Sequence, residues 1–278
     1  MSRYDPEPVR ASARWLTLRE PADAAARSVE LVEALRPHLP DGRDLVVHDL
    51  GSGSGSMARW LAPRLPCRQH WILYDRDVEL LEMVPANPPA VPAGAGPLTL
   101  ETRRRDITRL APNELSGAGL VTASALLDML TAEELDRLVA SCAGAGCPVL
   151  VTLSVVGRVE LDPADPLDEV VQAAFNAHQR RDNGAGRLLG PDALERAVSA
   201  FVGRGLDVAV RTSPWQLGSE QAVLASAWFE GWLGAALEQQ PDLGDRVISY
   251  RRRRRAEAIS GLLAVTVHHE DLLATPTG

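Results

Sequence analysis

One segment constrains the fold more than any other: an apolar run that ends at Asp49 and passes directly into a glycine-rich turn. The run over 45–50 is rich in valine and too short for a helix, which is typical of a buried parallel strand. Glycine stands at every second position from 51 to 55, and a helical pattern follows. Such glycines let the backbone bend tightly and approach a ligand where a side chain would collide. The segment therefore predicts an α/β unit with a ligand-binding turn.

The alternation of strand and helix continues along the chain. Short apolar runs predict further strands at 70–75, 98–104, 119–124, 148–155, 206–211 and 262–267. Helical spacing predicts helices at 56–65, 77–84, 132–142, 167–180, 191–203, 219–238 and 244–259. Strands that alternate with helices form a mostly parallel sheet with helices on both faces, so the fold class is α/β.

The two ends of the chain are expected to add helices to this α/β core. Residues 1–20 indicate at most a short helix, and Pro21 is expected to open a better one. We expect an N-terminal helical segment over 1–40 and an α/β domain over 41–278, with helical cap insertions after residue 156.

Three acidic residues follow three successive predicted strands. Asp49 ends the first strand, Asp75 closes the next, and Asp106 follows the third. The carboxyl ends of parallel strands meet at one edge of the sheet, where open α/β sheets bind ligands. An acid at the second place can accept hydrogen bonds from both ribose hydroxyls. Asp106 can receive an adenine amino group while Ile107 packs on the ring.

These residues resemble the class I S-adenosylmethionine-dependent methyltransferases. That family's Asp-x-Gly-x-Gly-x-Gly pattern and its acidic motifs after the second and third strands are all present, and residues 120–128 match the fourth motif loosely. The resemblance spans about residues 45–155 and implies a seven-stranded Rossmann-like domain that binds S-adenosylmethionine. The residues that it assigns to the methyl donor are Asp49, Gly51, Ser52, Gly53, Gly55, Asp75, Arg76, Asp106, Ile107 and Ser124.

A basic residue ahead of the first strand often binds the donor's carboxylate in related enzymes. The resemblance gives Arg27 this role, with Arg19 as a second candidate, and a solvated helical arginine stays open for both. A dinucleotide-binding fold is the alternative for the glycine turn. Its Gly-x-Gly-x-x-Gly fingerprint would place Ser56 at the third glycine and leaves Asp49 without a role, so the methyl donor is favoured.

Catalytic residues are harder to predict, because methyl transfer needs mainly alignment of the reactants and exclusion of water. A general base helps where the acceptor arrives protonated. His178 and Asp128 are the candidates, and the alternatives are a solvated helix end for the first and a helix cap for the second. Trp215 is a candidate for the pocket wall, whereas the apolar face over 224–232 is typical of a core.

Composition excludes several other functions. The chain has a net charge of −8, which argues against a nucleic-acid backbone as its main partner. All 29 basic residues are arginine, which excludes a Schiff-base lysine and the lysine of a phosphate-binding P-loop. The arginine run 251–255 is expected to be solvated surface. Three cysteines, and the adjacent acids and histidines at 268–271, lack metal-ligand spacing, so no metal is expected.

We therefore expect a methyltransferase that acts on a small-molecule acceptor by in-line transfer. Two alternatives stay open: a donor-binding protein that acts through a partner without catalysis, and an RNA methyltransferase, which the arginine run motivates. The N-terminus carries no secretory signal, and no apolar run approaches the roughly 20 residues of a membrane helix, so a cytoplasmic location is expected. The acceptor and the oligomeric state are not predicted.

Overall fold

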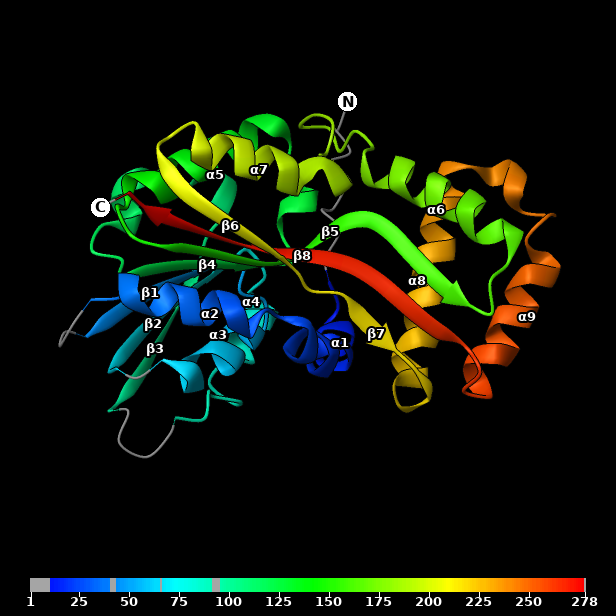
Figure 1. Cartoon of the computed structure of the whole chain (residues 1–278), viewed down its shortest axis with the longest axis horizontal. Helices are drawn as coiled ribbons and strands as arrows, with labels where there is room; N and C mark the ends of the chain where they lie inside the picture. The colour runs from blue at the N-terminus through cyan, green and yellow to red at the C-terminus, as the bar shows by residue number, and fades with distance from the viewer. Residues whose placement is uncertain (1–10, 41–43, 66, 92–95, 278) are drawn as a thin grey trace, which may run out of the picture.

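A central sheet in the order β3-β2-β1-β4-β5-β8-β6 runs through the computed structural model (Figure 1). The structure describes residues 11–40, 44–65, 67–91 and 96–277. Adjacent strands are parallel along the sheet from β3 to β5, whereas β8 is antiparallel to both of its neighbours, β5 and β6. A short extra strand, β7, pairs with β8 beside this path. The predicted seven-stranded, mostly parallel sheet is confirmed, with one strand added.

The helices and strands lie close to their predicted positions, although β5 and β8 are longer than expected. The strands are β1 (Leu45–Leu50), β2 (Gln69–Asp75), β3 (Leu98–Arg104), β4 (Leu120–Ser124), β5 (Val149–Asp162), β6 (Leu206–Thr212), β7 (Trp215–Leu217) and β8 (Ala264–Pro276). The helices are α1 (Ala13–Ala26), α2 (Val29–Leu35), α3 (Ser56–Leu61), α4 (Val78–Glu82), α5 (Ala132–Gly144), α6 (Pro166–Gln179), α7 (Ala193–Val202), α8 (Ala222–Gln239) and α9 (Ile248–Ile259). Over the described ranges, none of these helices combines the length and apolarity needed to cross a membrane.

The N-terminal helix differs from the prediction. Pro21 does not open a helix but lies inside α1, whose N-terminus is capped by Ser12. An internal proline costs a helix about 3 kcal/mol. The apolar residues Trp15, Leu18 and Ala22 of α1 pack against a buried cluster, and this packing offsets the local cost. The predicted start of the α/β domain, at residue 41, lies outside the described residues.

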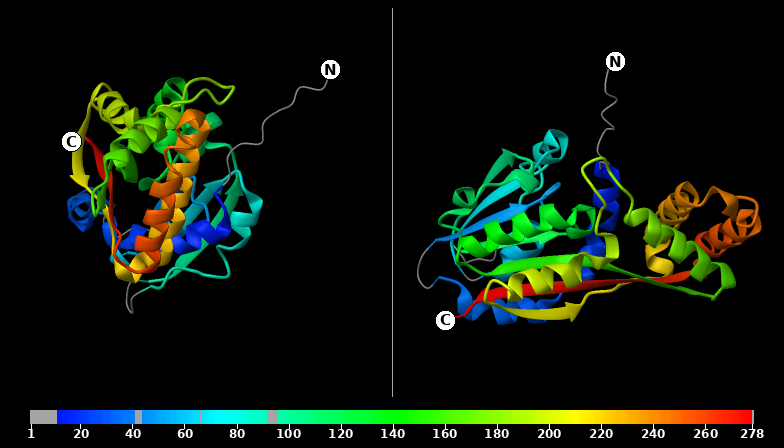
Figure 2. Two further views of the ribbon diagram at one scale, coloured as in Figure 1. Left: turned by 90° about the vertical axis from the view of Figure 1, so that its right-hand side faces the viewer. Right: turned by 90° about the horizontal axis from the view of Figure 1, so that it is seen from above.

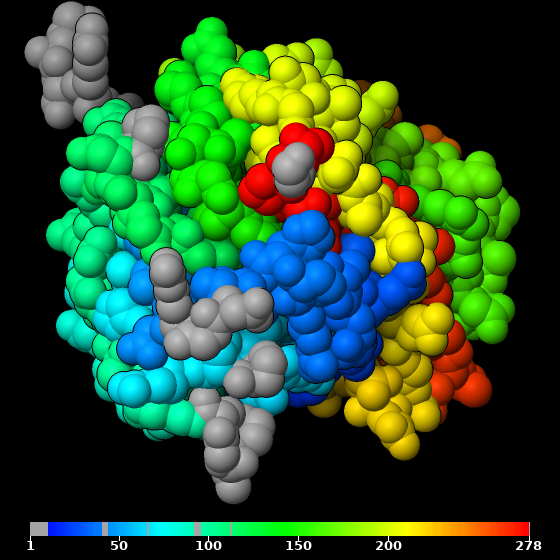
Figure 3. Space-filling model, turned by 60° about the vertical axis from the view of Figure 1, so that its left-hand side comes forward, coloured from blue at the N-terminus to red at the C-terminus, as the bar shows by residue number. Residues whose placement is uncertain are grey.

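Both faces of the sheet are covered. One face packs against α5 and α7, and the other packs against α2 and α3. The outer halves of β5 and β8 extend beyond the other strands as an arm, and α6, α8 and α9 gather along it (Figures 1 and 2). Figure 3 shows α2 beside β6 near the end of β8, where Glu30 pairs with Arg211 at 2.6 Å. The arm and α1 enclose the space in front of the sheet's carboxyl edge.

The arginine run on α9 is only partly solvated. Arg254 is 1% exposed and pairs with Asp168 of α6 at 2.6 Å and with Glu257 at 2.9 Å. Arg251 and Arg255 both pair with Glu230 of α8. The expectation of solvated surface is therefore wrong for Arg254, because successive residues point around the helix and this one faces α6. These ion pairs join α9 to α6 and α8, and the three together are called the cap helices.

A buried carboxylate ties three distant segments to β8. Asp271 is fully buried, and its Oδ1 accepts hydrogen bonds from the Leu153 amide at 2.7 Å and the Ser213 hydroxyl at 2.5 Å. Its Oδ2 accepts from the Ser28 amide at 2.7 Å. One side chain thus holds the middle of β5, the start of α2 and the β6–β7 connection.

We expect Asp271→Ala to lower the free energy of unfolding by about 3–5 kcal/mol, because three buried donors lose their acceptor at roughly 1–3 kcal/mol each. Denaturant unfolding followed by circular dichroism measures the change. Asp207→Ala, at an exposed site on β6, is the matched control and should stay within about 0.5 kcal/mol of the unmodified protein. An Asp271 variant as stable as this control would contradict the joining role.

Candidate functional site

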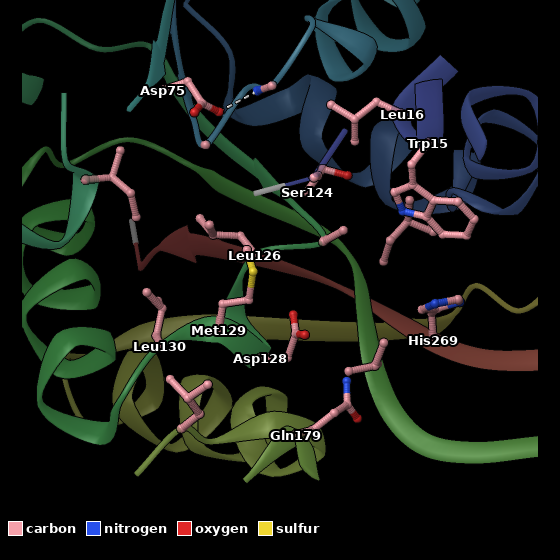
Figure 4. Close-up of a pocket in the computed structure, with 18 of the residues that line it drawn as sticks. Trp15, Leu16, Asp75, Ser124, Leu126, Asp128, Met129, Leu130, Gln179 and His269 are labelled. Atoms are coloured by element: carbon pink, nitrogen blue, oxygen red, sulfur yellow. Dashed lines mark hydrogen bonds between the residues drawn. The ribbon is translucent and has the colours of Figure 1, made fainter. Parts of the chain in front are cut away.

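A cavity of about 1630 Å³ lies at the carboxyl ends of the parallel strands. Pockets for one small ligand usually occupy about 300–1,000 Å³, so this one has room for two. The structure brings all the predicted site residues except Gly55 to its walls; those that line it are Arg27, Asp49, Gly51, Ser52, Gly53, Asp75, Arg76, Asp106, Ile107, Ser124, Asp128 and His178. Figure 4 shows one part of the cavity, with Asp75 and Asp128 on opposite sides of it.

The glycine turn between β1 and α3 adopts a conformation that side chains rarely allow. Gly51, Gly53 and Gly55 have φ values of 67°, 53° and 85°. A Cβ atom on Gly51 would lie 2.9 Å from a methyl of Leu126, and one on Gly53 would lie 3.1 Å from a methyl of Leu16. Gly55 does not line the cavity, but its left-handed backbone starts α3. Glycine is therefore needed here both for the turn and for close packing.

Asp75, at the end of β2, braces this turn. Its Oδ2 accepts a hydrogen bond from the Gly53 amide at 2.8 Å, and its Oδ1 accepts from the Asp77 amide at 2.9 Å (Figure 4). Each carboxylate oxygen has a second lone pair. The side chain can therefore still accept hydrogen bonds from a ligand's hydroxyl groups.

Asp106 and Ile107 form the next part of the wall. Asp106 caps a short 3-10 helix by accepting from the amide and the hydroxyl of Thr108, at 3.1 and 2.7 Å. Its side chain is 48% exposed, whereas Ile107 is buried. An apolar surface beside an exposed carboxylate fits a flat ring that carries an amino group.

Two opposite charges are buried at the base of the cavity. Asp49 is 1% exposed; its Oδ1 accepts from the Thr122 hydroxyl at 2.7 Å, and burial raises the pKa of this carboxyl group to about 7. Arg27 is also buried, and its Nη2 donates to the hydroxyls of Ser56 at 3.0 Å and Ser124 at 3.1 Å. Within the described residues, Asp49 Oδ2 and Arg27 Nη1 have no hydrogen-bond partner. The open alternative of a solvated helical arginine is thus wrong for Arg27.

The two catalytic candidates differ in how freely they face the cavity. His178, on α6, is bonded through Nε2 to Glu238 at 3.1 Å and through Nδ1 to Arg181 at 3.3 Å. Burial and the charge of Arg181 lower the pKa of His178, whereas Glu238 opposes this shift. Burial raises the pKa of Asp128, while Arg19 and Arg181 oppose the shift. Both ring nitrogens of His178 are thus engaged by neighbouring side chains, and Asp128 lines the cavity beside it.

Several residues of the site were not predicted. Thr122 and Thr152 lie within buried strands, where they contact Asp49 and Arg27. A polar residue inside an otherwise apolar strand was the available signal. Of the two adjacent histidines on β8, His269 is buried at 4% exposure, whereas the side chain of His268 is 24% exposed.

The aromatic predictions for the cap are also confirmed. Trp215 lines the cavity. The apolar face over 224–232 contributes to a buried cluster, and Trp228 of that face also reaches the cavity wall. The cap helices therefore supply both core and cavity surface.

The sheet order, with its antiparallel β8, and the residues at its carboxyl edge define the fold of the class I S-adenosylmethionine-dependent methyltransferases. Among solved structures, the cyclopropane synthase MmaA2 from Mycobacterium tuberculosis is similar over 95% of this chain and 94% of its own, with a TM-score of 0.51 and 10% identity. At this identity the likeness is one of fold.

Two further structures are similar at lower TM-scores. The mycolic acid cyclopropane synthase CmaA1, complexed with SAH and CTAB, matches 88% of this chain and 83% of its own (TM-score 0.48, 12% identity). An S-adenosylmethionine-dependent methyltransferase from Geobacter sulfurreducens, in complex with S-adenosylhomocysteine, matches 97% and 100% (TM-score 0.44, 13% identity). No protein-family model matches the chain, and no curated protein is similar to it in sequence.

The buried carboxyl group of Asp49 should make stability depend on pH. Its pKa in the fold, about 7, lies above the ordinary 3.8, so its stabilising contribution is complete below about pH 4 and is lost as the pH rises towards 7. Relative to Asp49→Asn, the unmodified protein should lose up to about 4 kcal/mol of unfolding free energy over this range. Denaturant unfolding of both proteins between pH 4 and 7.5 measures the difference, and a flat difference would refute it.

Proposed function

We propose that the protein is an S-adenosylmethionine-dependent methyltransferase that acts on a small-molecule acceptor. The observation that carries the proposal is the order of groups along one sheet edge. A buried guanidinium and a buried carboxyl group come first, then the carboxylate of Asp75, then Asp106 beside Ile107. This order matches a ligand with an amino-acid end, a ribose and an amino-substituted ring.

The residues present fit this donor. Asp49 and Arg27 each keep one buried polar atom without a partner in the described part of the chain, which suits an ammonium and a carboxylate group. Asp75 would hold the ribose hydroxyls, and Asp106 the adenine amino group. The turn at Gly51 and Gly53 leaves no side chain between backbone and ligand. When bound, S-adenosylmethionine supplies a methyl carbon activated by its positive sulfonium.

The chain's own contribution to catalysis is then alignment, dehydration and removal of a proton. The walls at Trp15, Leu126 and Leu130 exclude water from the acceptor side of the cavity (Figure 4). Asp128, as a carboxylate, accepts the proton that the acceptor's hydroxyl or amine loses, and its raised pKa suits that task. No metal is needed for these steps.

The two alternatives have less support. A donor-binding protein without catalysis would need no proton acceptor in the cavity wall, where Asp128 lies. An RNA substrate was motivated by the arginine run, but Arg251, Arg254 and Arg255 of that run pair with acids of the cap. The positive charge of these three arginines is therefore balanced by acidic residues of the same protein.

Donor binding is tested with Asp75→Ala. Because the variant leaves ribose hydroxyls without an acceptor, we expect its affinity for S-adenosylmethionine to fall by about 1–3 kcal/mol, roughly 5- to 150-fold. Calorimetric titration with S-adenosylmethionine, S-adenosylhomocysteine and NADH measures binding, and NADH should not bind. Glu79→Gln, an exposed change on nearby α4, is the control. Equal donor affinity in the two variants would show that Asp75 does not bind the donor.

Catalysis is tested with Asp128→Asn. We expect formation of S-adenosylhomocysteine, with a small-molecule extract of the source cells as the acceptor supply, to fall about 10²- to 10⁴-fold at unchanged donor affinity. His178→Gln is the comparison and should lose less than about tenfold, because its ring is already held by two partners. Full turnover by the Asp128 variant would exclude it as the base.

A further inference from the structure

We propose that the cavity beyond the donor loops binds an acceptor made of an apolar body and one anionic group, a carboxylate or a phosphate, and that Arg19 receives the anion. This inference rests on the proposed function, because it names the class of molecule that would be methylated in the same cavity. It is carried by the way in which α1 holds the Arg19 side chain.

One row of side chains on α1 faces the donor loops. Leu16 approaches Gly53 so closely that a Cβ there would meet it at 3.1 Å. Glu20, one turn later, pairs with Arg59 of α3 at 2.6 Å. This row therefore covers the glycine turn and leaves the neighbouring row of α1 for the other part of the cavity.

The neighbouring row consists of Trp15, Arg19 and Asp23 and meets Trp215 of β7. The Nε atom of Arg19 donates to both carboxylate oxygens of Asp23, at 3.0 and 3.1 Å. Asp23 is itself fixed, because its Oδ1 also accepts from the indole nitrogen of Trp215 at 3.0 Å. The guanidinium carbon lies 4.9 Å from the ring centroid of Trp215 and 6.0 Å from that of Trp15.

This arrangement decides which part of Arg19 can bind a ligand. The Nε edge is occupied by Asp23, and indole rings cover the guanidinium, so the Nη1 and Nη2 edge remains. Arg19 lines the cavity with 15% of its side chain exposed, and no residue in the described ranges accepts a hydrogen bond from either Nη atom. A guanidinium edge held in one orientation matches the two oxygens of a carboxylate or phosphate.

Large apolar side chains alternate with polar ones along the rest of this part of the cavity. The apolar ones include Trp15, Leu130, Val155, Phe175, Trp215 and Trp228, and the polar ones include Asp128, His178, Gln179 and His269. The Nη edge of Arg19 is a charged donor, so a negatively charged group is stabilised there more than a neutral oxygen would be.

The test compares pairs of probes with the same hydrocarbon skeleton, one ending in a carboxylate and the other in a neutral hydroxyl group. The pairs are 2-naphthoate with 2-naphthylmethanol, and dodecanoate with dodecanol. Binding to the full chain is followed by calorimetry, with and without saturating S-adenosylhomocysteine. We expect at least one carboxylate to bind tenfold or more tightly than its alcohol, and this preference to vanish in Arg19→Gln. Arg19→Lys should keep part of it, because the charge remains while the two-pronged geometry is lost.

Arg158→Gln is the matched control, since Arg158 also lines the cavity but is paired with Glu160, and it should keep the preference. Thermal unfolding of each variant checks that α1 is intact. Equal binding of acids and alcohols, or a preference that survives in Arg19→Gln, overturns the proposal. Arg19→Gln that weakens S-adenosylhomocysteine instead of the carboxylates also overturns it, by assigning Arg19 to the donor. If S-adenosylhomocysteine binds to no form, the proposed function fails, while the titrations without it still decide the role of Arg19.

Discussion

The arrangement of the site depends on one desolvated carboxylate. Asp271 has no access to water, and three donors from different segments converge on it. The amide of Ser28 follows directly on Arg27 in the chain, so the same contact anchors the backbone next to Arg27, whose guanidinium lies at the base of the cavity. The hydroxyl of Ser213 precedes β7, which carries part of the acceptor wall. The carboxylate of Asp271 on β8 thus holds in place the segments that carry both the donor end and the acceptor wall.

The donor end itself is governed by burial of opposite charges. Asp49 and Arg27 are both nearly inaccessible to solvent. Burial raises the pKa of Asp49 and lowers the pKa of Arg27, so in each case it favours the neutral form. A zwitterionic ligand would reverse both shifts, because it brings each buried group a partner of opposite charge. Protons are then exchanged with solvent when the ligand binds, and the affinity for it varies with pH near neutrality.

The sequence predicts the local features of the chain well and the long-range ones poorly. The turn after Asp49 is recognisable because a strand, three glycines and a helix follow one another directly. Pro21 was misplaced because packing from other elements overrides the local preference of a helix. Arg254 was taken for surface because its partner Asp168 is far away in sequence. The joining role of Asp271 had no local signal, since it depends on three segments that only the fold brings together.

Helix α1 is fastened on two sides, to α3 through Glu20 and Arg59 and to β7 through Asp23 and Trp215. It cannot move away from the glycine turn without also displacing Trp215 in the wall of the acceptor part of the cavity. A single helix therefore contributes to both parts of the cavity, and a substitution that shifts α1 is expected to alter the donor side and the acceptor side together.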